Sequence, residues 1–298
     1  MVDKMTLSLS KQNDEWSTTL LAAQRQLYSE ARRAVNAQYI LAGLVALLGQ
    51  LMGCVAPEAR PIVGLTSILI TILNSSILKP VGRNRAKIAA SIQEEFDTST
   101  LGLPWNEVLA GRLPEPQTIV EASGRFGGDR SALRDWYGDV TGAPWEIGVL
   151  LCQRENLSWN WRLKRTISNL ALCYVVGACL ISLYVAVVMR VEIATILMAL
   201  LPWLPFFLLV TDLALVQREE ARADEALARQ IDSMIEDTIA DKVTTSVTDL
   251  RRIQDILFGN RSRGHSTPDW LYWRRKNSLQ ESSRAVREQY LRRARLHT

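Results

Sequence analysis

The chain has 298 residues, of which 48% are hydrophobic and 22% charged, and 35 Lys and Arg against 31 Asp and Glu give a net charge of +4. This small net positive charge argues against a dedicated nucleic-acid binder, and no DNA or RNA duplex is expected as a partner. The four cysteines form no C-x-x-C pair, which argues against a zinc site or a disulfide framework.

The first segment, residues 1–38, is predicted to be cytosolic and to contain an amphipathic helix. From Asn13 to Gln38, apolar residues recur at spacings of three and four positions, which is typical of a helix with one buried face. Asn13 is the expected N-cap. Because acidic and basic residues are mixed along this segment, packing on the rest of the cytosolic part is favoured over a helix lying on the membrane surface.

Residues 39–78 are predicted to form a first hairpin of two membrane-spanning helices. Tyr39–Ala56 and Ile62–Leu78 are apolar runs, and the short segment Pro57-Glu-Ala-Arg-Pro between them supplies a turn. The runs approach the roughly twenty apolar residues with which a helix crosses a hydrocarbon core of about 30 Å.

Residues 79–166 are predicted to be a cytosolic helical insert. We expect a helix from Arg85 to Phe96, a break at Asp97–Thr100, and a short helix from Glu107 with Asn106 as its N-cap. A further short helix is expected from Ala132 to Tyr137.

The insert also contains a glycine-rich stretch, residues 124–129, which is expected to be a plain loop. It does not follow a strand, and it lacks the Gly-Lys-Ser/Thr ending of a phosphate-binding loop. From Pro144 a long helix is expected to continue into the third membrane span.

Residues 167–216 form the more strongly apolar second hairpin. Two runs of roughly twenty residues are separated only by Arg190, Val191 and Glu192, which leaves no room for a domain. Pro202 and Pro205 each remove a backbone donor from the fourth span, so a kinked or broken helix is expected there.

Residues 217–298 are predicted to be a cytosolic helical region. The helix continues beyond Asp212, and the poor helix formers of residues 244–248 are expected to bend it. A basic loop is expected at Gly259–Pro268 and a basic helix at Ser278–Arg295. A solvated face and attraction to lipid headgroups remain alternative interpretations of that helix.

The orientation of the spans follows from their basic flanks, because Lys and Arg near span ends are retained on the cytoplasmic side. The two short turns contain only two basic residues, Arg60 and Arg190. Both termini and the insert are therefore expected in the cytoplasm, as is the input signal. The basic residues on that side are Arg32, Arg33, Lys79, Arg83, Arg85, Lys87, Arg162, Lys164, Arg165, Arg218 and Arg222.

The residues suggest no catalytic or metal site, so we expect no enzyme, no metal and no cofactor. His265 and His297 are the only histidines, and both lie near the C-terminus. Asp129, Asp135 and Asp139 are close in sequence, but surface charge is favoured over a carboxylate or magnesium site.

Small and polar residues form stripes on the spans. The second span carries Ser67, Thr71 and Asn74 on one face, the first carries Gln50, and the third carries Ser182. Close helix packing is favoured over pore lining, although the two are compatible. Four packed helices leave no wide lumen, so any channel is expected to be a homo-oligomer in the lipid bilayer.

Six short segments, spread over most of the chain, have a distinctive order and spacing. They are Ala90-Ser-Ile-Gln-Glu-Glu-Phe-Asp97, Leu103-Pro-Trp-Asn106, Leu133-Arg-Asp-Trp-Tyr137, Cys152-Gln-Arg-Glu-Asn156, Ile253-Gln-Asp-Ile-Leu257 and Pro268-Asp-Trp-Leu-Tyr272. Together they resemble the SMODS-associated four-transmembrane effectors, a family of bacterial antiphage systems. The resemblance implies a pore-forming or membrane-disrupting effector of the inner membrane, encoded beside a nucleotidyltransferase that makes a cyclic oligonucleotide.

A cyclic oligonucleotide would require cations for its phosphates and aromatic faces for its bases. The motif segments of the insert offer Arg134, Trp136, Tyr137 and Arg154 as candidates, although structural packing is favoured for the two aromatic residues. Two alternative functions remain: a membrane anchor or scaffold that never conducts, and a membrane enzyme, which the missing nucleophile and metal set disfavour.

Overall fold

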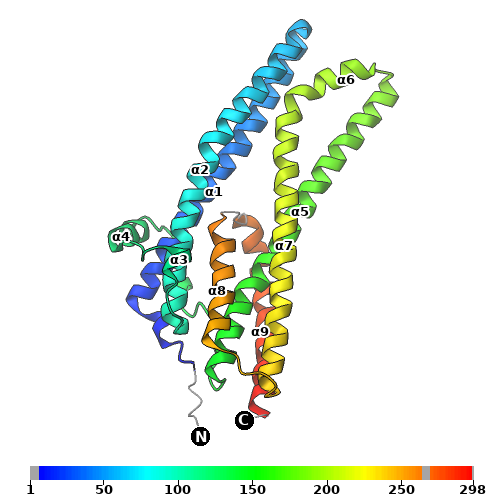
Figure 1. Ribbon diagram of the computed structural model, residues 1–298. Coiled ribbons are helices and arrows are strands. Elements are labelled where there is room, and N and C mark those ends of the chain that lie inside the picture. The colour runs from blue at the N-terminus through cyan, green and yellow to red at the C-terminus, as the bar shows by residue number, and fades with distance from the viewer. Residues whose placement is uncertain (1–6, 264–268, 297–298) are drawn as a thin grey trace. The chain divides into compact units, whose positions relative to one another are not determined.

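The fold is all-α in the part of the chain that the computed structural model describes, residues 7–263 and 269–296 (Figure 1). This confirms the predicted fold class. The chain divides into two compact units. Unit 1 comprises Met1–Glu30, Arg83–Leu163 and Glu220–Thr298, and unit 2 comprises Ala31–Gly82 and Lys164–Glu219.

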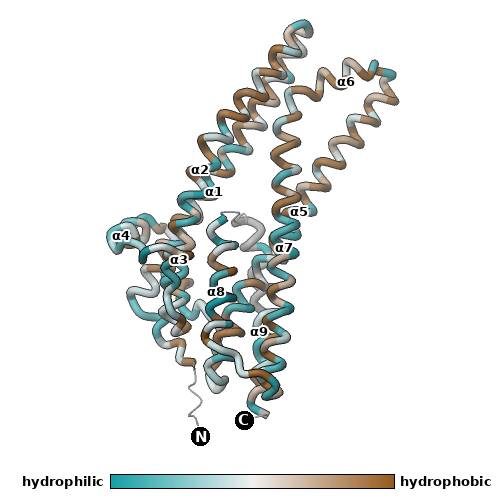
Figure 2. The backbone as a smooth tube through the Cα atoms, viewed as in Figure 1, coloured by the Kyte–Doolittle hydropathy of each residue, from teal (hydrophilic) through white to brown (hydrophobic). Residues whose placement is uncertain are grey.

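Unit 2 contains four helices that are long and apolar enough to cross a membrane. Figure 2 shows hydrophobic residues concentrated along the unit 2 parts of these helices. Many of their large apolar side chains are exposed, among them Leu48, Leu69, Leu180 and Leu208, which is what a lipid-facing surface requires. The helices are α1 (Glu15–Val55), α2 (Arg60–Leu101), α5 (Trp145–Met189) and the pair α6 (Ile193–Leu200) and α7 (Leu204–Ile239).

The turns of both hairpins are short, as predicted. The first is a single 3-10 turn, Pro57–Ala59, between α1 and α2. In the second, Arg190 has a positive φ of 50°, and the chain enters α6 after Glu192. The predicted break in the fourth span is confirmed, because Pro202 lies in a 3-10 turn at Leu201–Trp203 while Pro205 falls in the first turn of α7.

Unit 1 is built from the other halves of the same helices. The start of α1, the end of α2, the start of α5 and the end of α7 surround one apolar core, to which Leu20, Phe96, Leu150 and Ile231 contribute fully buried side chains. The N-terminal helix therefore packs on the core, as favoured from sequence. The remaining elements of unit 1 are α3 (Glu107–Ala110), α4 (Pro116–Gly124), α8 (Val247–Ser262), α9 (Asp269–Leu296) and the 3-10 turns Ser10–Asn13 and Ser131–Leu133.

The predicted helix break at Asp97–Thr100 is wrong, because α2 continues to Leu101. Asp97 is buried and bonded to other helices, and the Thr98 hydroxyl donates to the backbone oxygen of Glu94 within α2 (2.8 Å). Neither side chain competes for local backbone donors, which is how such residues end helices. The helix ends instead at Gly102, whose φ of 70° suits glycine.

The predicted helix at Ala132–Tyr137 is also wrong. A 3-10 turn ends at Leu133, Arg134 is extended, and Asp135 has a φ of 50°. Asn13 holds this conformation, since its amide donates to the Asp135 carboxylate (2.8 Å) and accepts from the Asp135 backbone N–H (2.9 Å). Asn13 is therefore not the N-cap of α1, which begins at Glu15.

Two further boundaries were predicted. Asn106 occupies the N-cap position of α3, as expected, but its side chain makes no capping bond and its amide donates to Asp255 (2.9 Å). The poor helix formers at residues 244–248 separate two helices rather than bend one, and a capping box between Ser246 and Asp249 starts α8. Helix α8 then runs to Ser262, into the loop predicted at 259–268, whose residues 264–268 lie outside the described part.

Candidate functional site

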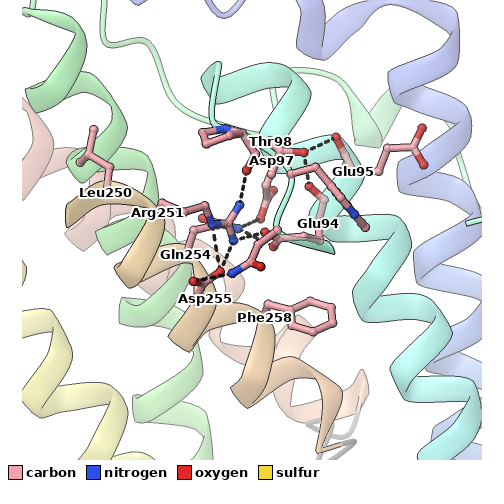
Figure 3. Close-up of polar contacts among 12 residues, drawn as sticks. Glu94, Glu95, Asp97, Thr98, Leu250, Arg251, Gln254, Asp255 and Phe258 are labelled. Carbon is pink, nitrogen blue, oxygen red and sulfur yellow. Dashed lines mark hydrogen bonds and ion pairs between the residues drawn. The ribbon is translucent and has the colours of Figure 1, made fainter. Parts of the chain in front are cut away.

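The main polar feature of unit 1 is a buried ionic network between α2 and α8, here called the α2–α8 cluster (Figure 3). It consists of Glu94 and Asp97 on α2 and Arg251, Gln254 and Arg261 on α8. A spacing of three positions places the two carboxylates on one face of α2, and the same spacing places Arg251 and Gln254 opposite them.

Asp97 lies at the centre of the cluster. Its carboxylate accepts from Arg261 Nη1 (2.5 Å) and Gln254 Nε2 (3.0 Å) at one oxygen and from the Tyr137 hydroxyl (2.7 Å) at the other. Glu94 pairs with Arg251 and accepts from Gln254 Nε2 (2.8 Å). Both acidic side chains are buried, so each depends on these donors to offset lost hydration.

Helix α5 and the insert complete the network. Asn156 donates to the Tyr137 hydroxyl (2.9 Å), and Gln153 donates to the Gln254 side chain (3.2 Å) and to the Leu250 carbonyl (2.9 Å). Three helices and the segment after the 3-10 turn therefore meet at one buried polar site. Helices α2 and α5 both continue from unit 1 into segments long and apolar enough to span a membrane, so this site lies on helices that the two units share.

Burial sets the electrostatics of the cluster. Burial and the charge of Asp97 raise the pKa of Glu94, while Arg251 and Gln254 lower it. Burial and the same aspartate also raise the pKa of the Tyr137 hydroxyl, which keeps it a donor. Burial lowers the pKa of Arg261, but Asp97, Tyr137 and Tyr28 together outweigh burial and the net shift is upward, so this guanidinium stays charged.

The raised pKa of Glu94 predicts a pH dependence of stability. Because the folded chain binds this proton more tightly than the unfolded chain, the stabilisation is complete below the ordinary glutamate pKa of about 4.3. It is lost as pH rises through the raised value. We therefore expect the melting temperature of the wild type minus that of Glu94→Gln, both measured in detergent, to fall over that pH interval. A difference that stays constant with pH would contradict the raised pKa of Glu94.

The structure separates the four residues predicted to bind a nucleotide. Arg134 is exposed, whereas Tyr137 is buried in the α2–α8 cluster. Trp136 is half-buried, with its ring edge-on to Phe96 (6.3 Å between centroids) and the guanidinium of Arg25 at 5.5 Å.

Arg154, the fourth candidate, lies on α5 and forms a two-point ion pair with Asp232 of α7. Asp232 lies 78 positions after Arg154 in the sequence. Arg134 is thus the candidate cation with the accessible side chain.

The polar stripe of the second span lies within unit 2. Ser67 and Thr71 are buried, and the Ser67 hydroxyl donates to the Val63 carbonyl in its own helix (2.9 Å). Asn74 donates to the backbone oxygen of Gln38 on α1 (3.2 Å). In a single chain these side chains are therefore involved in helix packing.

The stripe residues of the other spans are less buried. Gln50 on α1 is half-buried, and Ser182 on α5 is half-buried with its hydroxyl donating to the Ala178 carbonyl one turn earlier (2.8 Å). Whether any of these residues lines a pore stays a prediction.

Each of the three insert aspartates is engaged by the protein itself. Asp129 accepts from the backbone and hydroxyl of Ser131, Asp139 does the same for Thr141, and Asp135 bonds with Asn13. Within residues 7–263 and 269–296, no three His, Cys, Asp or Glu side chains are placed to hold a metal ion. His265 and His297 lie outside the described residues.

Comparison with known proteins decides the family. The profile of the SMODS-associating 4TM effector domain matches residues 9–290. The chain belongs to this family. It is also similar to a protein of Bacillus cereus (strain VD146) described as a probable CBASS effector molecule, with 28% identity over 285 residues, covering 92% of this chain and 94% of that protein. No solved structure matches the chain.

The family assignment supports an effector role in antiphage defence and favours a membrane protein without enzymatic activity. It also explains why several motif segments meet in one place. Four of the segments that carried the resemblance to the SMODS-associating effectors supply the α2–α8 cluster or the side chains bonded to it. These side chains are Glu94, Asp97, Tyr137, Gln153, Asn156 and Gln254.

Sequence reasoning missed the cluster because Glu94 was assigned to the end of one helix and Asp97 to the break expected after it. The available signal was their spacing within an otherwise apolar helix face, together with a matching Arg251 and Gln254 spacing on a distant helix. Nothing in the sequence pairs those two helices.

Proposed function

We propose that this chain is a defence effector of the bacterial inner membrane, with both termini in the cytoplasm, that permeabilises the membrane when a cyclic oligonucleotide binds its cytosolic unit. The observation that carries the proposal is the continuity of four helices through both units. The helices with exposed apolar surfaces in unit 2 are the same helices that build the buried core of unit 1. A cytosolic signal that rearranges unit 1 can therefore act on the spans without a further element.

The relative's description as a probable CBASS effector supports this function, as does the family's name. The cytoplasmic placement of unit 1 is supported by the basic residues at its junctions with unit 2. Arg83, Lys87 and Arg222 are exposed close to where the helices leave unit 2. Basic residues at such positions are retained in the cytoplasm and attracted to anionic headgroups.

Permeabilisation is proposed to require several copies of the chain. The polar stripe residues Ser67 and Thr71 are buried within one chain, and the exposed surfaces of the spans are mainly apolar. A water path therefore needs either an assembly of subunits or a rearrangement that exposes the polar stripe. We propose a homo-oligomer as the conducting form.

Arg134 is proposed to contact the phosphates of the ligand, because it is an exposed cation in the insert, two positions before the half-buried Trp136. Arg154 and Tyr137 are proposed to act indirectly, by fixing the helices around that segment. A ligand bound here can shift the chain only through a higher affinity for one of its conformations.

A reconstitution experiment tests the function. The purified chain is placed in liposomes loaded with a self-quenching dye, and a panel of synthetic cyclic di- and trinucleotides is added outside. We expect one of them to cause leakage and to bind in calorimetry, and we expect Arg134→Ala to weaken both by about ten-fold or more, as loss of a charge-assisted contact does. Binding without leakage would favour the scaffold function instead. No binding by any cyclic nucleotide would reject the proposed trigger.

A further inference from the structure

Helix α9 bridges α5 and α7 through polar contacts in unit 1 (Figure 1). Toward α5, Arg287 Nη1 donates to Glu155 (2.8 Å), and the hydroxyls of Ser283 and Ser158 lie 3.0 Å apart. Toward α7, the Tyr290 hydroxyl donates to Asp232 (3.0 Å). The bridge continues with ionic and polar contacts from Arg293 to Glu236, from Arg162 to Ser282 and from Arg295 to the Thr141 carbonyl.

The charges in this bridge are more exposed to water than Asp97 at the centre of the α2–α8 cluster. The side chains of Arg293 and Glu236 are 50% and 58% exposed, and those of Arg287 and Glu155 are 15% and 21% exposed. Asp97, by contrast, is fully buried. Releasing α9 would return partly exposed charges to solvent, which costs less than stranding a fully buried ion.

Beyond Glu281, where the side chains of α9 are described, few apolar groups oppose such a release. Leu291 and Ala294 are the buried aliphatic side chains there, the Tyr290 ring is buried beside them, and Val286 packs against the same core. Burial and the charge of Asp232 raise the pKa of Tyr290 to about 12, so its hydroxyl remains a donor at physiological pH. Over residues 281–295, the attachment of α9 therefore depends on specific polar contacts as well as on apolar area.

The two bridged helices are the ones that continue into the second hairpin. Arg154 of α5 and Asp232 of α7 pair directly, and α9 binds both helices at this level. A helix attached to both partners opposes their separation. Loss of α9 would leave Arg154–Asp232 as the ionic contact between α5 and α7 at this position.

We propose that α9 is an autoinhibitory clasp that holds α5 and α7 together in the resting chain and detaches when the effector is activated. The proposal rests on the proposed membrane-permeabilising function and adds its regulation. Gly138 is part of the device, because a Cβ atom there would collide with the Arg287 guanidinium. Glycine at this position lets Arg287 pass close to the backbone and reach Glu155.

A charge swap tests the clasp. Arg287→Glu places two carboxylates together and should raise leakage from liposomes without any nucleotide by about ten-fold, within the usual range of coupling energies. The double variant Arg287→Glu with Glu155→Arg restores opposite charges and should return leakage toward the resting level. Arg284→Glu is the matched control, because it makes the same change on the same helix in an exposed pair with Glu288.

Hydrogen exchange separates release from unfolding in the same samples. In Arg287→Glu, peptides of α9 should lose protection while peptides of α8, residues 247–262, keep it. A chain that responds to a cyclic nucleotide, yet in which Arg287→Glu frees α9 without raising basal leakage, would overturn the clasp. A wild-type chain that never leaks under any stimulus would instead reject the permeabilising function and, with it, this role of α9.

A reversible crosslink tests the opposite direction. Cysteines at Ser158 and Ser283 would place two sulfur atoms near bonding distance, since the native hydroxyl oxygens are 3.0 Å apart. We expect the oxidised pair to abolish nucleotide-induced leakage and a reductant to restore it. Full leakage with α9 locked would overturn the proposal. The experiment uses a background in which Cys54, Cys152, Cys173 and Cys179 are replaced by alanine.

Discussion

Asp97→Asn is expected to destabilise unit 1 by about 3–5 kcal/mol, the range found when one partner of a buried ion pair is removed. The substitution keeps the size of the side chain and one acceptor oxygen for Tyr137 or Gln254. It removes the charge opposite Arg261, whose side chain is only 8% exposed and pairs with no other carboxylate in the described part of the chain. A buried guanidinium without its counter-ion is the source of the loss.

The measurement is hydrogen exchange of α8 in detergent or liposomes. A loss of this size should lower the protection of its amides by roughly two to three orders of magnitude, since about 1.4 kcal/mol corresponds to a factor of ten. Tyr28→Phe is the matched control, because the Tyr28 hydroxyl is buried near the same charges and makes no hydrogen bond within the described residues. Removing an unsatisfied buried hydroxyl should be close to neutral.

A double variant distinguishes the lost pair from a general packing defect. Asp97→Asn combined with Arg261→Met removes both charges. The double variant should therefore lose less stability than the two single variants lose in sum. Equal protection of α8 in Asp97→Asn and Tyr28→Phe would show that the α2–α8 cluster does not hold the helices together.

The membrane-spanning part of the fold could be predicted because it follows from composition alone. Runs of apolar residues and short charged turns specify helical hairpins without reference to any partner, and Pro202 breaks a helix through its own missing donor. These features depend on residues adjacent in sequence. They required no knowledge of tertiary contacts.

Unit 1 was harder to predict because its local signals are overridden by distant partners. Asp97 and Thr98 favour a helix end by propensity, yet Asp97 bonds with α8 and the helix continues to Leu101. Asn13 has the chemistry of an N-cap, yet it binds Asp135, more than a hundred positions away. A single sequence gives the type of each side chain and leaves its partner undetermined.

The same distinction applies to the candidate site. Arg154 was selected as a phosphate-binding cation by residue type, and the structure pairs it with Asp232. Arg287 lay in a tail considered only as a solvated or lipid-facing helix, and the structure connects it to Glu155 on α5. Both assignments depend on which helices lie side by side. That information becomes available only from the fold.

Gly64→Val is expected to disturb the packing of the fourth span on the first hairpin within unit 2. A Cβ atom at Gly64 would lie 2.6 Å from Leu201 Cγ, and one at Gly49 would lie 3.0 Å from Pro202 Cβ. The break at Leu201–Trp203 therefore sits against two glycines of α1 and α2. A side chain at Gly64 must displace Leu201 or push the two hairpins apart.

Overpacking of this kind costs about 1–3 kcal/mol, which corresponds to a fall in melting temperature of roughly 5 °C for a chain of this size. Gly177→Val is the matched control, because it makes the same change in the third span where no atom lies within 4 Å of the added Cβ. The measurement is thermal unfolding of both variants in one detergent. If the two variants have the same melting temperature, the break does not pack against these glycines. If Gly64→Val alone is destabilised, the proline break is a packed element of the resting membrane unit, because a free hinge would tolerate the extra side chain.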